Sequence, residues 1–438
     1  MSSPSLSPFD AAAILIVLAA ALGYLNYRFL KLPSSVGLTI MGAVASLIVV
    51  AIDRLLPASD VAPSVAGFLA DIDFHETLMN GMLSFLLFAG ALHVDWSDMR
   101  KGRWPILVLS TIGVLISTTI VGFGFYLLTS LLALQMPLLW CFVFGALISP
   151  TDPVAVMGVL KRAAVPPTLQ ATVAGESLFN DGVGVVVFTI IVAAAAGSGH
   201  FSIAHAGEAF LFEAGGGVIL GLAVGYVGFR AMRSIDDYGV EVMISLAMVM
   251  GGYSLAQSLH VSGPVAMAVA GLLIGNAGVA LAMSDVTRDY LLKFWALIDE
   301  LLNAVLFLLI GLEVIAISPD PRLLAAGLAA IPLVLVARTI AVAAPLGAMR
   351  PWLKMGRLAV PTLVWGGLRG GISIALALSL TEGASRTTIL AVTYVIVLFS
   401  VIVQGSTVGG LIRRLSPKEA ASDGSSMASG GPSRAPEK

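Results

Sequence analysis

Long apolar runs recur along almost the whole chain, and short polar stretches separate them. An α-helix needs about 20 apolar residues to cross the hydrocarbon core of a bilayer. By this criterion the sequence predicts an all-α membrane protein with thirteen transmembrane helices. The predicted segments are, in order, residues 10–30, 35–53, 75–94, 104–130, 137–160, 168–197, 208–230, 239–259, 262–283, 290–317, 321–349, 357–381 and 387–412.

The composition agrees with this pattern. Of the 438 residues, 58% are hydrophobic and only 11% are charged, whereas a soluble domain carries about 25% charged residues. The net charge of −2 gives no sign of a nucleic-acid partner, and the single cysteine, Cys141, excludes an internal disulfide. The N-terminus lacks the basic stretch of a cleavable signal peptide, so residues 10–30 are predicted to be a retained helix.

The basic residues predict an orientation. Most of the 24 Lys and Arg residues fall in alternate loops, and only Arg54, Arg322 and Arg386 fall in the loops of the opposite side. The positive-inside rule then places the N-terminus outside and the C-terminus in the cytoplasm. Residues 1–9 are predicted to be an extracytoplasmic N-terminus, residues 10–414 the transmembrane domain, and residues 415–438 a disordered cytoplasmic tail rich in Ser, Gly, Pro and Lys.

Two predicted helices contain breaks. SPTDP (149–153) interrupts the fifth segment, and WGGLRGGIS (365–373) interrupts the twelfth. Proline removes a backbone donor and glycine loosens a helix. Broken helices at corresponding places in two halves are typical of transporters built from inverted repeats. We expect two six-helix repeats, roughly 35–230 and 239–412, with the broken helices crossing.

Polar side chains gather near the start of the sixth segment, in GESLFND (175–181). Ser177 and Asp181 are four residues apart and share one helix face, and Glu176 and Asn180 share the adjacent face. A carboxylate in hydrocarbon is costly enough to indicate a function. Considered alone, Asp181 could be a residue that makes only a structural hydrogen bond. The nearby Asn180 and Ser177, together with the two helix breaks, favour a functional role.

The first break adds Thr151 and Asp152. Where a helix unwinds, backbone carbonyls lose their partners and can coordinate a cation. Together with the side chains of Ser177 and Asp181, these oxygens make a set of hard ligands that suits a hard cation.

Two arginines fall inside predicted helices. Arg338 stays charged under physiological conditions and needs a carboxylate partner. We expect Glu176 to be that partner in a structural ion pair, because Asp181 must remain free to titrate. Arg369, among four glycines, is expected to neutralise carbonyl ends at the second break. The sequence leaves open whether the two arginines exchange these roles.

The other polar residues within the apolar segments are expected to be interfacial or solvated. They are Asp299, Glu300 and Glu313, and a cytoplasmic funnel lining is an alternative for Asp299, Glu300 and the nearby Asn303. The histidines lack metal-ligand spacing and are predicted to lie at the surface; they are His75, His93, His200, His205 and His260.

A set of motifs follows in order along the chain: ISPTDPVAV, GESLFNDGVGVVVF, LFLLIGLEV, the Arg338 helix and WGGLRGGISIALAL. This set resembles the monovalent cation:proton antiporter-1 family, the NhaP-type bacterial sodium/proton antiporters related to the eukaryotic sodium/proton exchangers. The resemblance implies an inverted-repeat antiporter fold and a homodimer, and the short loops and short tail suggest a bacterial-type protein of the inner membrane. It also implies Asp181, beside Asn180, as the carrier of cation and proton. Na⁺ is expected at Asp181, Ser177, Thr151 and Asp152, with a structural Glu176–Arg338 pair.

The expected function is therefore exchange of a monovalent cation for a proton by alternating access. Na⁺ is the expected cation, and Li⁺ and K⁺ are alternatives. Because Asn180 cannot titrate, one proton leaves Asp181 for each monovalent ion, so exchange is expected to be electroneutral. Several relatives carry an acidic residue on the third helix where this chain has Ala89, which leaves the choice among these cations open.

Other functions fit the sequence less well. A primary pump is excluded because no P-loop motif occurs, and a membrane protease would need an aspartic dyad of Asp152 and Asp181. A cation channel is the main alternative, since acid-lined broken helices also suit pores. No enzymatic activity and no cofactor are expected.

Overall fold

The protein is described here from a computed structural model, which covers residues 8–55, 67, 82–162, 165–197, 203–316, 320–350 and 358–415. Helices make up nearly all of these residues, and their only β-type pairing is one isolated bridge. Ten helices in this part of the chain are long and apolar enough to cross a membrane. The predicted all-α class is thus confirmed for the described residues.

The ten long helices have the following bounds. They are α1 (Pro8–Leu25, continued to Leu30), α2 (Ser34–Leu55), α7 with α8 (Arg103–Val108 and Val114–Leu131), α11 (Pro167–Ala196), α12 (Ile203–Met232), α13 (Tyr238–Ser258), α14 with α15 (Gly263–Leu273 and Val279–Leu281), α16 (Asp285–Leu312), α17 (Pro321–Met349) and α20 with α21 (Ala384–Phe399 and Gly405–Leu415).

Shorter helices occupy the three remaining predicted segments. They are α5 (Leu83–Leu92), the pair α9 (Leu138–Leu147) and α10 (Val154–Arg162), and the pair α18 (Ala359–Trp365) and α19 (Gly371–Leu378). A short helix, α6 (Trp96–Lys101), lies between α5 and α7. The first part of the third predicted segment and nearly all of the C-terminal tail lie outside the described residues.

Two helices, α12 and α16, begin five residues before their predicted starts, at Ile203 and Asp285. In α16 the reason is a cap, because the Ser284 hydroxyl accepts a hydrogen bond from Thr287 N. Ser, Thr, Asp and Asn are favoured at this position because their side chains satisfy a free backbone N–H. The first turns of α16 are polar, so a search for apolar runs does not include them.

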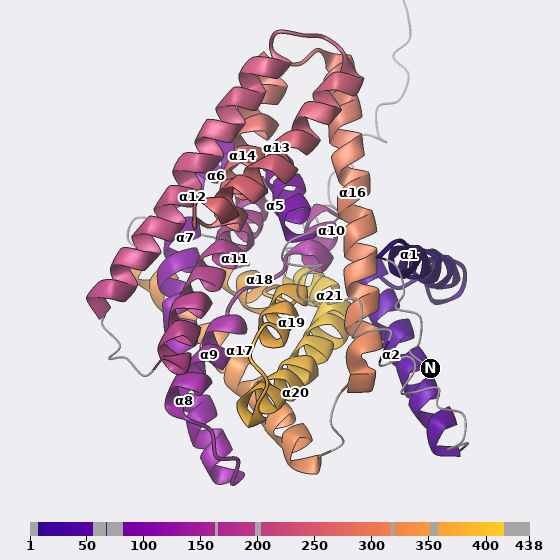
Figure 1. The fold of residues 1–438 in the computed structure, drawn as a ribbon, viewed down its shortest axis with the longest axis vertical. Coiled ribbons are helices and arrows are strands. Elements are labelled where there is room, and N and C mark those ends of the chain that lie inside the picture. The colour runs from indigo at the N-terminus through magenta and orange to yellow at the C-terminus, as the bar shows by residue number, and fades with distance from the viewer. Residues whose placement is uncertain are drawn as a thin grey trace, which may run out of the picture.

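The four short helices of the two broken pairs lie in the middle of the molecule (Figure 1). The long α16 passes along one side of them, and α12 lies toward the other. Helix α2 packs along α16, and the hydroxyl of Thr39 in α2 donates a 3.1 Å hydrogen bond to Phe307 O in α16. At the other side, α12 packs against α14, which also contacts α5.

Buried apolar side chains fill the spaces between the helices, and large apolar side chains also cover their outer faces. Trp295 of α16 is fully buried against Phe88, and its indole N–H donates to the Ser245 hydroxyl. By contrast, Leu131 of α8 and Leu211 of α12 are more than 70% exposed. An apolar exterior on long helices is what a lipid solvent requires.

Candidate functional site

The two broken helices are joined at their breaks. The backbone N–H of Asp152, between α9 and α10, donates a hydrogen bond of 2.8 Å to the carbonyl oxygen of Leu368, between α18 and α19. Pro150 and Pro153 flank this point and cannot donate, so the helix cannot continue through it. The two extended segments therefore lie against each other in the centre of the protein.

The side chain of Asn180 connects α11 to the first break. Its amide nitrogen donates to the Thr151 hydroxyl over 2.8 Å and to Glu176 Oε1 over 2.7 Å. Its oxygen accepts the Thr151 backbone N–H over 3.2 Å. The Ser177 and Thr151 hydroxyls are also 3.2 Å apart and hydrogen-bonded. This network fixes the break against α11 and uses both amide hydrogens of Asn180.

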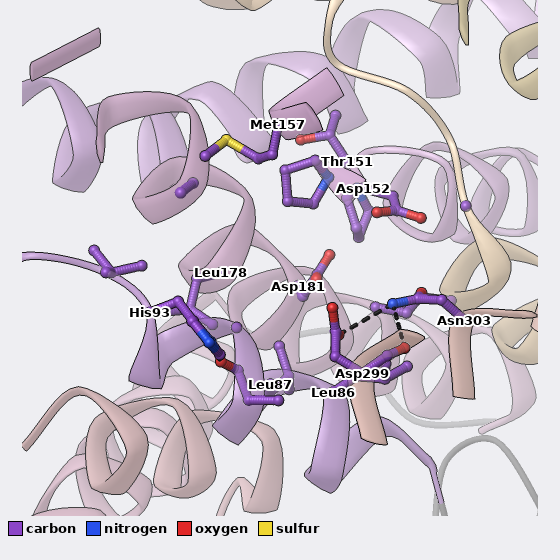
Figure 2. A pocket seen from close by; sticks show the side chains of 18 of the residues that line it. Leu86, Leu87, His93, Thr151, Asp152, Met157, Leu178, Asp181, Asp299 and Asn303 are labelled. Atoms are coloured by element: carbon purple, nitrogen blue, oxygen red, sulfur yellow. Dashed lines mark hydrogen bonds between the residues drawn. The ribbon is translucent and has the colours of Figure 1, made fainter. Parts of the chain in front are cut away.

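Asp181 differs from its neighbours. It is only 7% exposed, and it has no hydrogen-bond partner among the residues that the structure describes. It lines a cavity of about 490 Å³ that Thr151 and Asp152 also line (Figure 2). Asp152 and Glu176 are the carboxylates close enough to act on it electrostatically. A buried carboxylate facing an aqueous cavity without a fixed partner is free to bind a proton or a cation.

Glu176 has a different partner. The guanidinium of Arg338 donates to both of its carboxylate oxygens, over 2.8 and 2.9 Å, and both side chains are buried. The same guanidinium donates to Leu363 O in α18 through two nitrogens. Arg338 of α17 therefore neutralises Glu176 and also supports the end of the helix before the second break.

Arg369 lies in the second break but supports the first. Its Nη1 donates to the carbonyl oxygens of Ser149 and Pro150, over 2.6 and 2.9 Å. We expected it to neutralise carbonyl ends at the second break, and this expectation is wrong. The crossing of the two segments brings the carbonyl end of α9 within hydrogen-bond distance of the Arg369 guanidinium. Arg338 therefore pairs with Glu176, as expected, and also supports the second break, whereas Arg369 supports the first.

Two glycines permit this close crossing. A Cβ at Gly370 would lie 2.7 Å from Asp152 Cβ, and one at Gly367 would lie 2.6 Å from the Arg338 guanidinium. Only glycine allows such close approach without displacing the neighbour.

The remaining polar residues separate into three environments. Asp299 lines the cavity together with Asn303, whereas the adjacent Glu300 is exposed. Glu313 was expected to be interfacial or solvated; it is only 7% exposed, so the expectation of a solvated side chain is wrong. It lies at the end of α16, where neighbouring helices cover it. Ala89 is fully buried and lines the cavity.

The sequence-based prediction missed several residues of the cavity wall. His93 lies one turn after Ala89 on α5, and its Nδ1 lies 2.8 Å from Ala89 O. The four-residue spacing from Ala89 was a signal that it shares the same face. Asp95 and Asp98 also line the cavity, near one mouth. Asp95 caps α6, and the hydrogen bonds from Ser97 lower the pKa of Asp95 below its ordinary value, which keeps it anionic.

The described residues contain no cluster of three His, Cys, Asp or Glu side chains that would hold a transition metal or another resident metal ion. The residues near Asp181 in the cavity include Asp152 and Thr151, whose hydroxyl is hydrogen-bonded to that of Ser177, so the available ligands are carboxylate and hydroxyl oxygens. Such oxygens prefer hard cations.

Crossed broken helices beside a buried ionisable group are the arrangement of secondary ion transporters. Residues 15–414 match the family described as "Sodium/hydrogen exchanger, transmembrane", and the chain belongs to this family. It is therefore a multi-pass membrane protein, as the ten long apolar helices within its described residues also indicate.

Individual relatives agree with this assignment. The chain is 47% identical over 411 residues to the Na(+)/H(+) antiporter NhaP of Pseudomonas aeruginosa, covering 93% of this chain and 96% of that protein. It is 34% identical over 420 residues to the Na(+)/H(+) antiporter NhaH of Halobacillus dabanensis, covering 92% and 97%. Its fold is similar to that of the sodium proton antiporter MjNhaP1 from Methanocaldococcus jannaschii, with a TM-score of 0.72 at 22% identity, covering 93% and 98%.

Proposed function

We propose that this protein exchanges a monovalent cation for a proton across the membrane, by competition of the two at Asp181. Na⁺ is the expected cation, with Li⁺ and K⁺ as alternatives, and the named activity of the relatives supports this choice. The observation that carries the proposal is that Asp181 is buried, faces the cavity and has no hydrogen-bond partner among the described residues.

Asp181 has two favourable states, protonated and cation-bound. Its bare anion is unfavourable in a partly dry site. If the site changes its access from one side of the membrane to the other only in the two neutral states, cation and proton must move in opposite directions. The coupling then needs no further machinery.

The cation is proposed to bind Asp181 together with oxygens of Thr151, Asp152 and Ser177. The hydroxyls of Thr151 and Ser177 hydrogen-bond to each other and retain lone pairs for a cation. Asn180 positions this set through its bonds to Thr151. Arg369 holds the carbonyl end of α9 beside it.

Exchange is proposed to be electroneutral, with one proton per cation. Glu176 is neutralised by Arg338, and Asn180 cannot titrate, so neither supplies a second proton. Proton release from Asp152 during the cycle would contradict this stoichiometry. The measurement is transport in proteoliposomes under a clamped potential, because electrogenic exchange gains about 2.3 kcal/mol per charge per 100 mV.

The proposed topology has thirteen helices in the inner membrane, with the N-terminus outside and the C-terminus in the cytoplasm. The two inverted repeats span roughly residues 35–230 and 239–412. Residues 1–9 and 415–438 are proposed to be terminal segments outside the transmembrane domain, and the protein is proposed to be a homodimer. In this orientation the cavity wall that contains Asp95 and Lys161 faces the cytoplasm.

The test is pH-dye fluorescence in proteoliposomes to which Na⁺, Li⁺ and K⁺ are added in turn. We expect a cation-dependent proton flux without a current in the purified protein. Asp181→Asn keeps the size of the side chain and is expected to abolish this flux without changing the unfolding temperature by more than a few degrees. Near-normal flux in that variant, or a steady cation current in a bilayer, would refute the proposal.

A further inference from the structure

Asp299 of α16 contributes a carboxylate to the cavity from a helix separate from those that carry Asp152 and Asp181. Asn303, one turn later, holds it: the Asn303 amide nitrogen donates to Asp299 Oδ1 over 3.0 Å and to Asp299 O over 2.9 Å (Figure 2). Asp299 Oδ2 and Asn303 Oδ1 have no hydrogen bond within the described part of the chain. Two oriented acceptor oxygens therefore remain available on this wall.

A hydroxyl on α19 belongs to the same cavity wall. Ser373 is 1% exposed, it lines the cavity, and its Oγ has no hydrogen-bond partner among the described residues. Leaving such a buried group unsatisfied costs about 1–3 kcal/mol unless a ligand or water fills the gap. The helices α16 and α19 pack together, with Leu306 against Gly371. Asn303 lies three residues before Leu306 on the same face of α16, and Ser373 lines the same cavity from α19.

We infer that Asp299, Asn303 and Ser373 form a second cation-binding position in the cavity, which a monovalent cation occupies before it transfers to Asp181. All three provide oxygen ligands, and Asp299 provides the negative charge that a monovalent cation needs. Asp299 is more exposed than Asp181, so a cation can bind there with part of its hydration shell. Asp299 also gives the cavity an acidic side chain from α16, whereas α5 contributes Ala89 at the position where several relatives carry an acidic residue.

The arrangement predicts a specific kinetic role. A negative charge in a cavity with low-dielectric walls raises the local concentration of cations. In this proposal the cation leaves the position at Asp299 before the site changes its access from one side of the membrane to the other. Asp299 therefore determines the apparent KM for the cation and leaves the maximum rate unchanged. This inference rests on the proposed exchange at Asp181.

The test compares Asp299→Asn with Glu300→Gln in proteoliposomes at constant ionic strength. The two variants each remove one negative charge from adjacent residues, but only Asp299 lines the cavity. We expect Asp299→Asn to raise the KM for Na⁺ about tenfold with the maximum rate within about twofold of the wild type, and Glu300→Gln to change neither. Ser373→Ala, which removes only the hydroxyl, is expected to raise the KM by a smaller factor, about two- to threefold.

Four outcomes would overturn the inference: an unchanged KM in Asp299→Asn, an equal effect of Glu300→Gln, a lower maximum rate at unchanged KM, or an unchanged KM in Ser373→Ala. Ser373→Ala also carries the test if Asp299→Asn does not fold. If Asp181→Asn is inactive while Asp299→Asn has the same KM and maximum rate as the wild type, only this inference is refuted and the proposed exchange stands. Full activity of Asp181→Asn refutes the proposed exchange itself.

Discussion

The backbone N–H of Asp152 donates a 2.8 Å hydrogen bond to Leu368 O, and this bond joins the two broken helices at their crossing. The residues on either side of it depend on the same geometry. Gly370 lies directly against the Asp152 side chain, and Arg369 reaches across to the end of α9. A change at the crossing is therefore expected to reach the ligands of the proposed site.

Gly370→Ala tests the closeness of the crossing. The new Cβ would lie 2.7 Å from both Cβ and Oδ2 of Asp152, so Asp152 must move. We expect overpacking to lower the free energy of unfolding by about 1–3 kcal/mol. Displacement of Asp152 is expected to lower the rate of Na⁺-driven proton flux by about 10- to 100-fold, measured in proteoliposomes.

The matched control is Gly410→Ala in α21, where an added Cβ meets nothing within 4 Å. Alanine stabilises a helix relative to glycine by up to about 1 kcal/mol, so this variant is expected to be at least as stable as the wild type. Equal transport in the two variants would contradict the role given to the crossing.

Glu176→Gln tests the buried ion pair. It leaves the Arg338 guanidinium, which is about 7% exposed, without a charged partner. We expect a loss of about 3–5 kcal/mol of stability, measured by thermal unfolding in detergent. Adding Arg338→Met to Glu176→Gln removes the unpaired charge and should recover part of the loss. The remaining deficit is expected to be about 1–3 kcal/mol, because Leu363 O loses its donor.

An exposed ion pair provides the comparison. Asp289 and Lys293 are 2.6 Å apart on the surface of α16, with most of both side chains exposed. Asp289→Asn is expected to cost no more than about 0.5 kcal/mol. If Glu176→Gln costs as little as this variant, the pair with Arg338 does not hold the helices together.

Arg369→Met tests the support of the first break. Two charge-assisted hydrogen bonds to Ser149 O and Pro150 O would be lost, each of which contributes about 1.5–3 kcal/mol. We expect a loss of about 3 kcal/mol or more in thermal unfolding. Arg369→Lys keeps the charge but lacks the planar fork, so it is expected to restore only about half of the loss. If Arg369→Met is as stable as the wild type, the carbonyl oxygens of Ser149 and Pro150 do not need the guanidinium of Arg369.

Asn180→Asp tests the network on α11. An aspartate cannot donate to both Thr151 and Glu176, and its negative charge would lie next to the Glu176 carboxylate. We expect lower stability, by about 1–3 kcal/mol for each acceptor left without a donor. Because two carboxylates this close cannot both ionise without a large cost, we also expect exchange to remain insensitive to the membrane potential.

The measurements for this variant are thermal unfolding and transport under a clamped potential. A stable variant whose transport accelerates with the potential would indicate that residue 180 simply adds a titrating group. In that case the hydrogen bonds of Asn180 would be dispensable.

The membrane class and the helical segments could be predicted from the sequence because both depend on local properties. A run of about 20 apolar residues has no stable conformation in lipid other than a helix, so hydropathy locates segments such as α11 and α17 to within a few residues. Closely spaced prolines at 150 and 153 and the glycines around Arg369 likewise favour a break in the helix through local backbone effects. The polar start of α16 was missed because its cap and its charges lie outside the apolar run.

The partners of the charged residues depend less on local rules. Glu176 was the expected partner of Arg338 because a buried arginine needs a carboxylate, and the structure pairs them between α11 and α17. The partner of Arg369 was missed, because only the crossing of the two broken helices brings its guanidinium to the end of α9. The crossing thereby leaves Asp181 without a partner among the described residues and brings Asp299 to the same cavity. Helices form from neighbouring residues in the chain, whereas these pairings join positions more than 150 residues apart, which only the packed structure brings together.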